Sequence, residues 1–165
     1  MKSEKGNKSK FQDIHPTAII GDGTKIWNFV YIGEYVTIGN NCMIANFVHI
    51  DRDVKIGDNC KIQSMVYVPE YTRIGNNCMI YSNVCIINEK YPPTKKKAGV
   101  VIKDNCIVGS GAILQAGITL GEGCVVGAGS IVLDDVKSGA VVFGFPAHRH
   151  YLREEYEEKK REWES

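Results

Sequence analysis

Residues 44–86 read IANFVHIDRDVKIGDNCKIQSMVYVPEYTRIGNNCMIYSNVCI, and every sixth residue from Ile44 to Ile86 is isoleucine or valine. The same period extends back to Ile14 and, after a pause, continues from Ile102 to Val132. An α-helix repeats every 3.6 residues and a strand every two, so neither accounts for a period of six. A hexad is typical of one short strand and one tight turn, and three hexads close a coil that stacks on the next. We therefore predict an all-β solenoid, a parallel β-helix of about six coils.

Two positions of each hexad are expected to point into the solenoid: the aliphatic anchor and the small or aliphatic residue four positions later. Glycine often follows the anchor directly, as at Gly57 and Gly109. We expect these glycines to serve turns that need a positive φ, which glycine adopts without steric cost.

Five of the six cysteines fall on one column of the inward positions. They are spaced by three hexads, or one coil, on either side of the pause, and the sixth cysteine, Cys85, occupies an outward position. The column lacks the paired CxxC spacing of a zinc site, and cysteine packs well as a small apolar residue. We expect core packing, with neither disulfides nor a metal site, for Cys42, Cys60, Cys78, Cys106 and Cys124.

The cysteine column also measures the pause in the repeat. The step from Cys78 to Cys106 is one coil of three hexads plus ten further residues. A loop is therefore inserted within residues 88–101, which read NEKYPPTKKKAGVV. Loops that interrupt a regular scaffold often carry function, although a tolerated insertion is the alternative.

Composition and the two ends narrow the class of protein. The formal net charge is +1, without the basic excess of a nucleic-acid binder. No apolar run approaches the ~20 residues of a membrane span, and no signal peptide is visible, so a cytoplasmic protein is expected. We expect a disordered tail over residues 1–10, the β-helix over 11–150, and a helix over 151–165 that caps the last coil or packs on a neighbouring subunit. Its predicted ion pairs are Glu155–Lys159 and Glu157–Arg161.

The hexads, the inserted loop and the segment Gly144-Phe145-Pro146-Ala147 resemble the left-handed β-helix, hexapeptide-repeat acyltransferases over residues 11–150. Within that family, residues 25–29 (KIWNF), 61–63 (KIQ) and 87–92 (INEKYP) are most similar to sugar-nucleotide N-acetyltransferases that act on 3-amino sugars. The resemblance implies a left-handed coil and a homotrimer. It also implies acetyl transfer from acetyl-CoA to a nucleotide-linked amino sugar (UDP- or dTDP-linked), for surface polysaccharide or lipopolysaccharide synthesis, with no nucleic acid or membrane as partner.

His49 is the leading candidate for catalysis, because it is the only histidine inside the repeats. It lies in an outward column with Tyr31, Tyr67 and Cys85, each one coil apart, on the face that leads into the loop. A general-base or acceptor-binding role is one interpretation, and aromatic packing at a trimer interface is the other. The resemblance implies that Asn88 orients the acceptor.

The remaining candidates fall into two groups. The acceptor is expected to contact Tyr31, Gln63, Tyr67, Glu70 and Tyr91. Small residues that let the pantetheine lie close to the backbone, together with the chain end, are expected to bind CoA: Ser110, Gly111, Ala128, Gly129, Pro146 and Arg149. Arg149 or a lysine of 95–97 could meet a CoA phosphate, although a lysine run is often only solvated.

Several rival functions fit the sequence less well. A γ-type carbonic anhydrase would need three zinc-binding histidines per site, which one repeat histidine does not supply. A fusion with a nucleotidyltransferase would need a much longer chain. A non-catalytic β-helix would need neither the loop nor the chain end. An O-acetyltransferase, the main alternative, would depend strongly on His49, whereas an amine acceptor is already a nucleophile when neutral.

Overall fold

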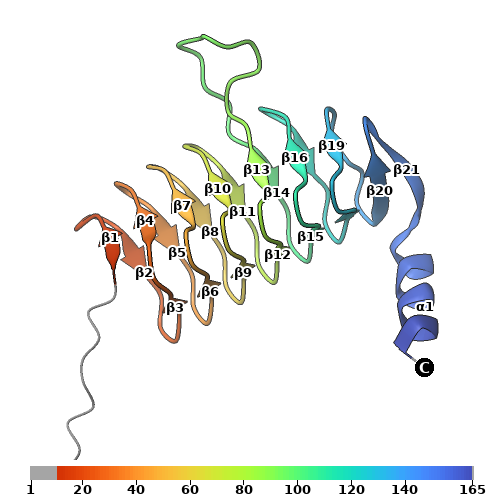
Figure 1. Cartoon of the computed structure of the whole chain (residues 1–165), viewed down its shortest axis with the longest axis horizontal. Helices are drawn as coiled ribbons and strands as arrows, with labels where there is room; N and C mark the ends of the chain where they lie inside the picture. The colour runs from red at the N-terminus through yellow and green to blue at the C-terminus, as the bar shows by residue number, and fades with distance from the viewer. Residues whose placement is uncertain (1–10, 165) are drawn as a thin grey trace, which may run out of the picture.

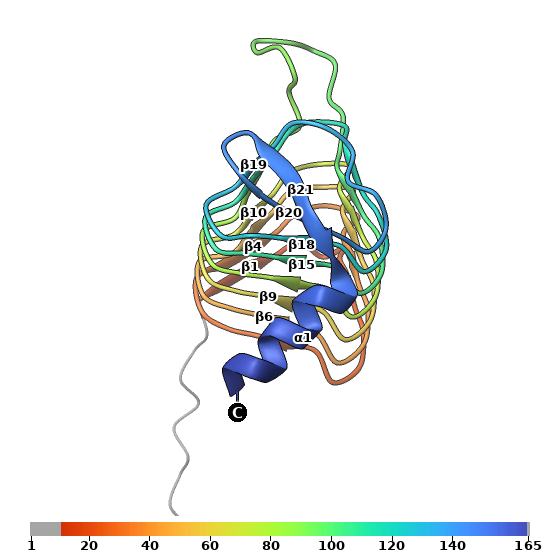
Figure 2. The same ribbon diagram turned by 90° about the vertical axis from the view of Figure 1, so that its right-hand side faces the viewer.

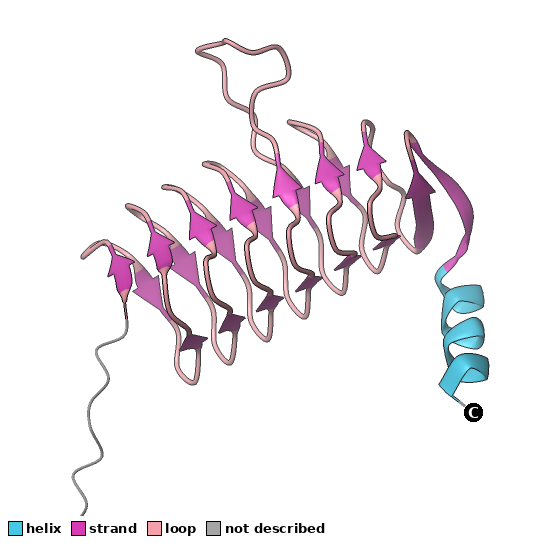
Figure 3. Ribbon diagram, viewed as in Figure 1, coloured by secondary structure: helices cyan, strands magenta, loops and turns pink. Residues whose placement is uncertain are grey.

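The computed structural model describes residues 11–164, which form a three-sided solenoid of short strands followed by one helix (Figures 1 and 3). Residues 1–10, the expected disordered tail, lie outside the described residues. Each side of the solenoid is one sheet, and we name the sheets A, B and C in chain order.

Within residues 11–164, sheet A has seven strands: β1 (Gln12–Ile14), β4 (Val30–Ile32), β7 (His49–Ile50), β10 (Tyr67–Val68), β13 (Cys85–Ile86), β16 (Ile113–Leu114) and β19 (Ile131–Val132). Sheet B has six: β2 (Ile19–Ile20), β5 (Thr37–Ile38), β8 (Lys55–Ile56), β11 (Arg73–Ile74), β14 (Val101–Ile102) and β17 (Thr119–Leu120). Sheet C has eight: β3 (Lys25–Ile26), β6 (Met43–Ile44), β9 (Lys61–Ile62), β12 (Met79–Ile80), β15 (Ile107–Val108), β18 (Val125–Val126), β20 (Ala140–Gly144) and β21 (Ala147–Leu152).

The predicted β-helix is confirmed, and each predicted anchor ends a strand from β1 to β19. Strands β1 to β18 make six complete coils. An irregular seventh coil follows, made of β19, an isolated parallel bridge between Leu120 and Val136, and β20.

The register confirms the size of the insertion. His49 pairs with Tyr67, the residue three hexads further on, as expected for parallel strands of successive coils. Across the pause the step between register partners grows by ten residues, as in the pair Met79 and Ile107. The ten extra residues leave the solenoid between β13 and β14 and project away from it (Figure 1).

The anchors form the core along the solenoid axis. Ile50, Ile62 and Leu114 are completely buried, as are most of their counterparts in other coils. Burying an aliphatic side chain of this size contributes roughly 1.5–3 kcal/mol. The stack of short strands is therefore stabilised mainly by this apolar column and by the hydrogen-bond ladders between coils.

The glycines that follow the anchors have a different role from the one expected. The turn residue with positive φ comes two positions later, as at Asn59 (φ 57°) and Gly111 (φ 69°), and it is usually not glycine. Gly57 and Gly109 do not have a positive φ. They are needed because the next coil is close: a Cβ on Gly109 would lie 2.5 Å from the backbone nitrogen of Ala128. The expected positive-φ role is therefore wrong for these two positions.

The cysteine column packs as predicted. Cys42, Cys60, Cys78, Cys106 and Cys124 are buried free thiols, and Cys85 is exposed. The thiols of the first four donate to backbone carbonyls of the next coil, for example Cys60 Sγ to Gly75 O at 3.0 Å, and Cys124 Sγ donates to Cys106 Sγ at 3.6 Å. Hydrogen bonding to Cys106 and burial raise the pKa of Cys124. Cys124 is therefore a neutral thiol, which suits its core position.

The C-terminal end departs from the hexad pattern. Strand β21 turns back antiparallel on β20, and Tyr151 and Leu152 belong to it. The helix α1 (Arg153–Glu164) therefore begins two residues later than expected. In Figure 2, which looks onto this end of the solenoid, β21 and α1 cross in front of the coils.

The start of α1 is attached to the solenoid through Arg153. Its guanidinium donates to Gly123 O at 3.2 Å, and its Nε pairs with Glu157 at 2.6 Å. Glu157 therefore pairs with the residue one turn earlier rather than with Arg161. In the described part of the chain, no helix combines the length and the apolar character needed to cross a membrane.

Candidate functional site

The outward residues of sheet A form a column of rings. Tyr31, His49 and Tyr67 are register partners on β4, β7 and β10, and Cys85 on β13 continues the column. The ring centroids of Tyr31 and His49 are 4.6 Å apart, and those of His49 and Tyr67 are 5.5 Å apart. Tyr31 and Tyr67 are each 37% exposed, so the column presents ring edges to solvent. The predicted column is therefore present on the surface.

A carboxylate joins two of these rings. Asp51 Oδ1 lies 3.1 Å from His49 Nε2, and Asp51 Oδ2 accepts a hydrogen bond from the Tyr67 hydroxyl at 2.7 Å. Burial, followed by the hydrogen bond to Asp51, raises the pKa of Tyr67 above its ordinary value. Tyr67 is therefore a protonated donor at neutral pH, and Asp51 has both oxygens engaged.

Asp51 was missed by reasoning from the sequence. A signal for it exists, because residues i and i+2 of an extended strand point to the same face. His49 and Asp51 have this spacing around the buried anchor Ile50. A search for a carboxylate two residues from the repeat histidine would have found the pair.

A charged corner borders the ring column. The turns from sheet A to sheet B, which we call the A–B corner, place Glu34, Arg52 and Glu70 in equivalent positions of successive coils. Arg52 Nε donates to Glu70 Oε2 at 3.0 Å. These three side chains, with Tyr31 and Asp51, line a hollow of about 370 Å³.

Asn88 occupies the same corner position one coil beyond Glu70, where the inserted loop begins. Its carbonyl accepts from Ala98 N at 2.9 Å, which closes the base of the loop. Glu89 forms an ion pair with Lys97 and accepts from Thr94 N at 3.1 Å. The bond to Lys97 and then that to Thr94 hold the pKa of Glu89 below its ordinary value. The loop therefore has a structured base.

Tyr91 lies further out in the loop and is 77% exposed. The loop and the next coil enclose a hollow of about 280 Å³, lined by Tyr91, Lys90, Thr94 and Gly117 among others. Tyr91 is thus available to a ligand or to a second subunit, and within residues 11–164 no hydrogen bond or ring contact joins it to the ring column.

The opposite edge of sheet A, the C–A corner, carries the residues predicted to bind CoA. Gly129 N donates to Ser110 O at 2.8 Å, so the Ser110-Gly111 and Ala128-Gly129 turns stack directly. Gly111 and Gly129 have positive φ, and nothing lies within 4 Å of where a Cβ would be. These turns therefore expose an open strip of backbone.

Nearer the N-terminus, the C–A corner carries aromatic side chains in place of the glycine turns. There it carries a stack of exposed rings, with centroids of Phe29 and Phe47 5.1 Å apart and those of Phe11 and Phe29 5.3 Å apart. Gln63 also lies at this corner and accepts from Ser82 Oγ at 3.1 Å. Gln63 is thus across sheet A from Glu70 and Asn88, and a single chain does not bring these three together.

Pro146 and Arg149 lie in the terminal hairpin. Pro146 is in the turn between β20 and β21, and Arg149 on β21 pairs with Val142. Arg149 lines a hollow of about 360 Å³ together with His148, Lys137, Asp134 and Asp135. The hairpin begins with β20, which closes the seventh coil, and it lies beyond the glycine turns along the chain.

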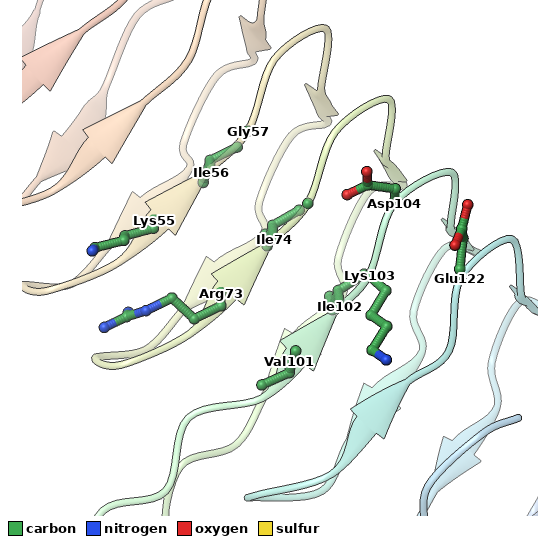
Figure 4. A pocket seen from close by; sticks show the side chains of 11 residues that line it. Lys55, Ile56, Gly57, Arg73, Ile74, Val101, Ile102, Lys103, Asp104 and Glu122 are labelled. Atoms are coloured by element: carbon green, nitrogen blue, oxygen red, sulfur yellow. The ribbon is translucent and has the colours of Figure 1, made fainter. Parts of the chain in front are cut away.

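Another hollow, of about 560 Å³, lies on sheet B (Figure 4). Lys55, Arg73 and Lys103 contribute its cations, and Asp104 and Glu122 lie along its edge. None of the sequence-predicted site residues lines it. Among the described residues, no three His, Cys, Asp or Glu side chains are grouped so that they could hold a metal ion.

Comparison with known families identifies the class of protein. The model of the bacterial transferases with hexapeptide repeats, written as six repeats, matches residues 17–52, 53–88 and 99–134. The chain belongs to this family of transferases, which confirms the resemblance stated above. A search of curated proteins gave no match to the chain.

Many solved structures share the fold, including the following two. AntD, an N-acyltransferase from Bacillus cereus in complex with dTDP and 3-hydroxybutyryl-CoA, is 21% identical, with 94% of this chain and 87% of that chain covered and a TM-score of 0.58. A mutant of perosamine N-acetyltransferase from Caulobacter crescentus, in complex with CoA and GDP-perosamine, is 18% identical, with 86% and 54% covered and a TM-score of 0.54. The chain thus spans about half the length of the perosamine enzyme.

Proposed function

We propose that this transferase is an acyl-CoA-dependent N-acetyltransferase whose acceptor is an amino sugar linked to a nucleotide. One observation carries the proposal: sheet A has a histidine–carboxylate pair on its surface, the inserted loop at one edge and an open strip of glycine turns at the other. The two structural neighbours, both N-acyltransferases in complex with a CoA compound and a nucleotide or nucleotide sugar, support this choice. A role in surface polysaccharide synthesis is part of the proposal.

The proposed step is direct acyl transfer. The neutral amine of the sugar attacks the thioester carbon of acetyl-CoA, and the new C–N bond forms as the carbonyl becomes a tetrahedral oxyanion. The oxyanion collapses, the C–S bond breaks, and the sulfur leaves as the thiol of CoA. His49 takes the proton lost by the amine, and a proton returns to the leaving sulfur.

We assign the other residues by position. Asn88, at the start of the loop, orients the amine. Tyr31, Tyr67, Glu70 and Tyr91 contact the sugar nucleotide from the ring column, the A–B corner and the loop. The pantetheine lies on the C–A corner, where Gln63 completes the binding site for the acceptor. The CoA contacts are with Ser110, Gly111, Ala128, Gly129, Pro146 and Arg149.

This division of residues favours a homotrimer. The acceptor group lies mainly at the A–B corner and in the loop, whereas the CoA group lies at the C–A corner. Packing the A–B corner of one chain near the C–A corner of the next, around a threefold axis, would complete each site from two chains. The exposed rings of Phe29 and Phe47 support the same arrangement, because a patch of large apolar side chains is typical of an interface.

The test is a panel of amino-sugar nucleotides with acetyl-CoA and 3-hydroxybutyryl-CoA, in which release of the CoA thiol is measured. We expect turnover with at least one amine acceptor. Absence of CoA binding by calorimetry would contradict the enzyme class and leave a non-catalytic β-helix. Turnover only with hydroxyl acceptors would contradict N-acetylation.

The His49–Asp51 pair also supports a second candidate, an O-acetyltransferase. A hydroxyl is a weak nucleophile and needs a base that removes its proton during attack. The substitution His49→Ala separates the two functions. For an O-acetyltransferase, His49→Ala should lower kcat roughly 10²-fold or more. For an amine acceptor the loss should be smaller, and it should shrink as the pH rises and more of the amine becomes neutral.

A further inference from the structure

We infer that Asp51 is the positioning residue of His49: it holds the imidazole in the tautomer that carries hydrogen on Nε2 and leaves Nδ1 as the proton acceptor. This inference rests on the proposed function for the identity of the acceptor, but not for the state of the imidazole.

His49 and Asp51 flank the same buried anchor and contact each other. His49 is the last outward residue before the anchor Ile50, and Asp51 is the first outward residue after it, so both project from the same face. The contact between Nε2 and Oδ1 is 3.1 Å. A carboxylate can only accept hydrogen bonds, so the hydrogen in this contact belongs to Nε2. The neutral ring then has its lone pair on Nδ1.

Tyr67 prevents the Asp51 side chain from turning away from His49. Its hydroxyl donates to Oδ2 at 2.7 Å from the next coil, so both oxygens of the carboxylate are fixed. Burial and the same hydrogen bond raise the pKa of Tyr67, so this donor persists across the physiological range. Tyr67 therefore fixes the Asp51 carboxylate, and the carboxylate in turn fixes the His49 ring.

The groups around His49 are few. Tyr31 stacks on it from β4 and Tyr67 lies against it from β10. Glu34, Arg52 and Glu70 line the adjoining hollow, and Arg52 is paired with Glu70. Asp51 is the group that contacts the imidazole nitrogen directly, so it is the group whose removal should change the tautomer and orientation of His49 most.

The arrangement has a chemical consequence. When Nδ1 takes a proton from the acceptor, the ring becomes a cation beside the Asp51 carboxylate, which stabilises it. A base oriented by a carboxylate is common in acyl-transfer sites, and here the orienting group comes from the same strand end. The His49 side chain is 49% exposed, so Nδ1 can reach a ligand.

The first test reads the tautomer directly by ¹⁵N NMR of the imidazole nitrogens in the full chain. The four histidines are few enough to assign with a His49→Gln spectrum. We expect hydrogen on Nε2 of His49 in the neutral protein. In Asp51→Asn, the tautomer preference should be lost, because Nε2 has lost its carboxylate acceptor. An Nδ1–H tautomer in the unmodified protein would overturn the inference.

The second test is kinetic. Asp51→Asn should lower kcat about tenfold with little change in KM for acetyl-CoA, because the base is no longer held in the competent tautomer. Tyr67→Phe should give a smaller change in the same direction. The matched control is Asp53→Asn, which removes the same charge two residues away, at a positive-φ position where Asn59 stands one hexad later. If Asp51→Asn and Asp53→Asn behave alike, Asp51 has no positioning role.

These outcomes are separable from those of the proposed function. If no acceptor of the panel is acetylated but His49 keeps the Nε2–H tautomer and loses it in Asp51→Asn, the positioning inference stands and the function fails. If an amine is acetylated while Asp51→Asn changes neither the tautomer nor kcat, the function stands and the inference fails.

Discussion

At the scale of single residues, the core of the described chain, residues 11–164, contains one side-chain polar group without a partner. Thr72 is completely buried, and its hydroxyl oxygen has no hydrogen-bond partner. The equivalent positions of the neighbouring coils are Val54 and Val100. A buried hydroxyl without a partner costs roughly 1–3 kcal/mol. Thr72 is therefore a site at which the natural sequence is less stable than the repeat allows.

We predict that Thr72→Val stabilises the protein by about 1 kcal/mol, because valine has the same shape and no polar group to satisfy. Denaturant unfolding of the full chain measures the change. The matched control is Thr24→Val, in which the lost hydroxyl donates to Gly39 O at 2.7 Å and accepts from Cys42 N at 3.0 Å. The control should be destabilised, and equal shifts in both variants would contradict the explanation.

A second prediction concerns the two glycines of one turn. Gly109→Ala should lower the free energy of unfolding by about 1–3 kcal/mol, because its methyl group would meet the backbone of Ala128. Gly111→Asn should be close to neutral in stability, because Asn83 has φ 61° at the same position one coil earlier. Thermal unfolding compares the two variants. A larger loss for Gly111→Asn would show that positive φ, rather than coil contact, restricts this turn.

At the scale of elements, the inserted loop is fastened at its base by Glu89. Because its pKa is lowered in the folded loop, the ion pair with Lys97 contributes fully above about pH 4.5, the ordinary value for this group. The contribution is lost as the pH falls through the lowered pKa. The base of the loop should therefore be insensitive to pH near neutrality.

We predict that Glu89→Gln loosens the loop at neutral pH. Hydrogen exchange of the amides of residues 90–97 should become faster, while exchange in the coils stays unchanged. Acidification of the unmodified protein should reproduce this effect only below about pH 4.5. Lys95→Gln, a charge change in the same loop at a residue that forms no ion pair with any other described residue, is the control and should leave exchange unchanged.

The strands and the inserted loop could be predicted from the sequence, but the terminal hairpin and the contacts of Asp51 could not. The strands and the inserted loop were predictable because they follow a strict period, and a break in the period has a measurable size. The hairpin of β20 and β21 was not, because the antiparallel pairing of Val142 with Arg149 has no repeating signature. The contact of Asp51 with His49 and Tyr67 was missed for a related reason: it depends on side-chain directions across two coils rather than on the period.

At the scale of the whole molecule, the candidate site is spread over both edges of one sheet. We predict that the protein is a trimer in solution, with a mass of about three times 18.3 kDa by light scattering. Phe47→Glu places a charge in the exposed ring stack and should lower this mass and weaken CoA binding together. A monomeric mass for the unmodified chain, with CoA bound normally, would contradict a site shared between subunits.

The closed base of the loop has one more consequence, for changes in chain length. Asn88 O and Ala98 N are joined by a hydrogen bond, so the chain returns to the solenoid where it left, whatever lies between them. Residues can be added or removed in this loop without altering the phase of later coils. A single deletion inside a coil would instead turn later anchors outward. If the loop contacts the acceptor as proposed, its length can change with the size of the acceptor independently of the scaffold.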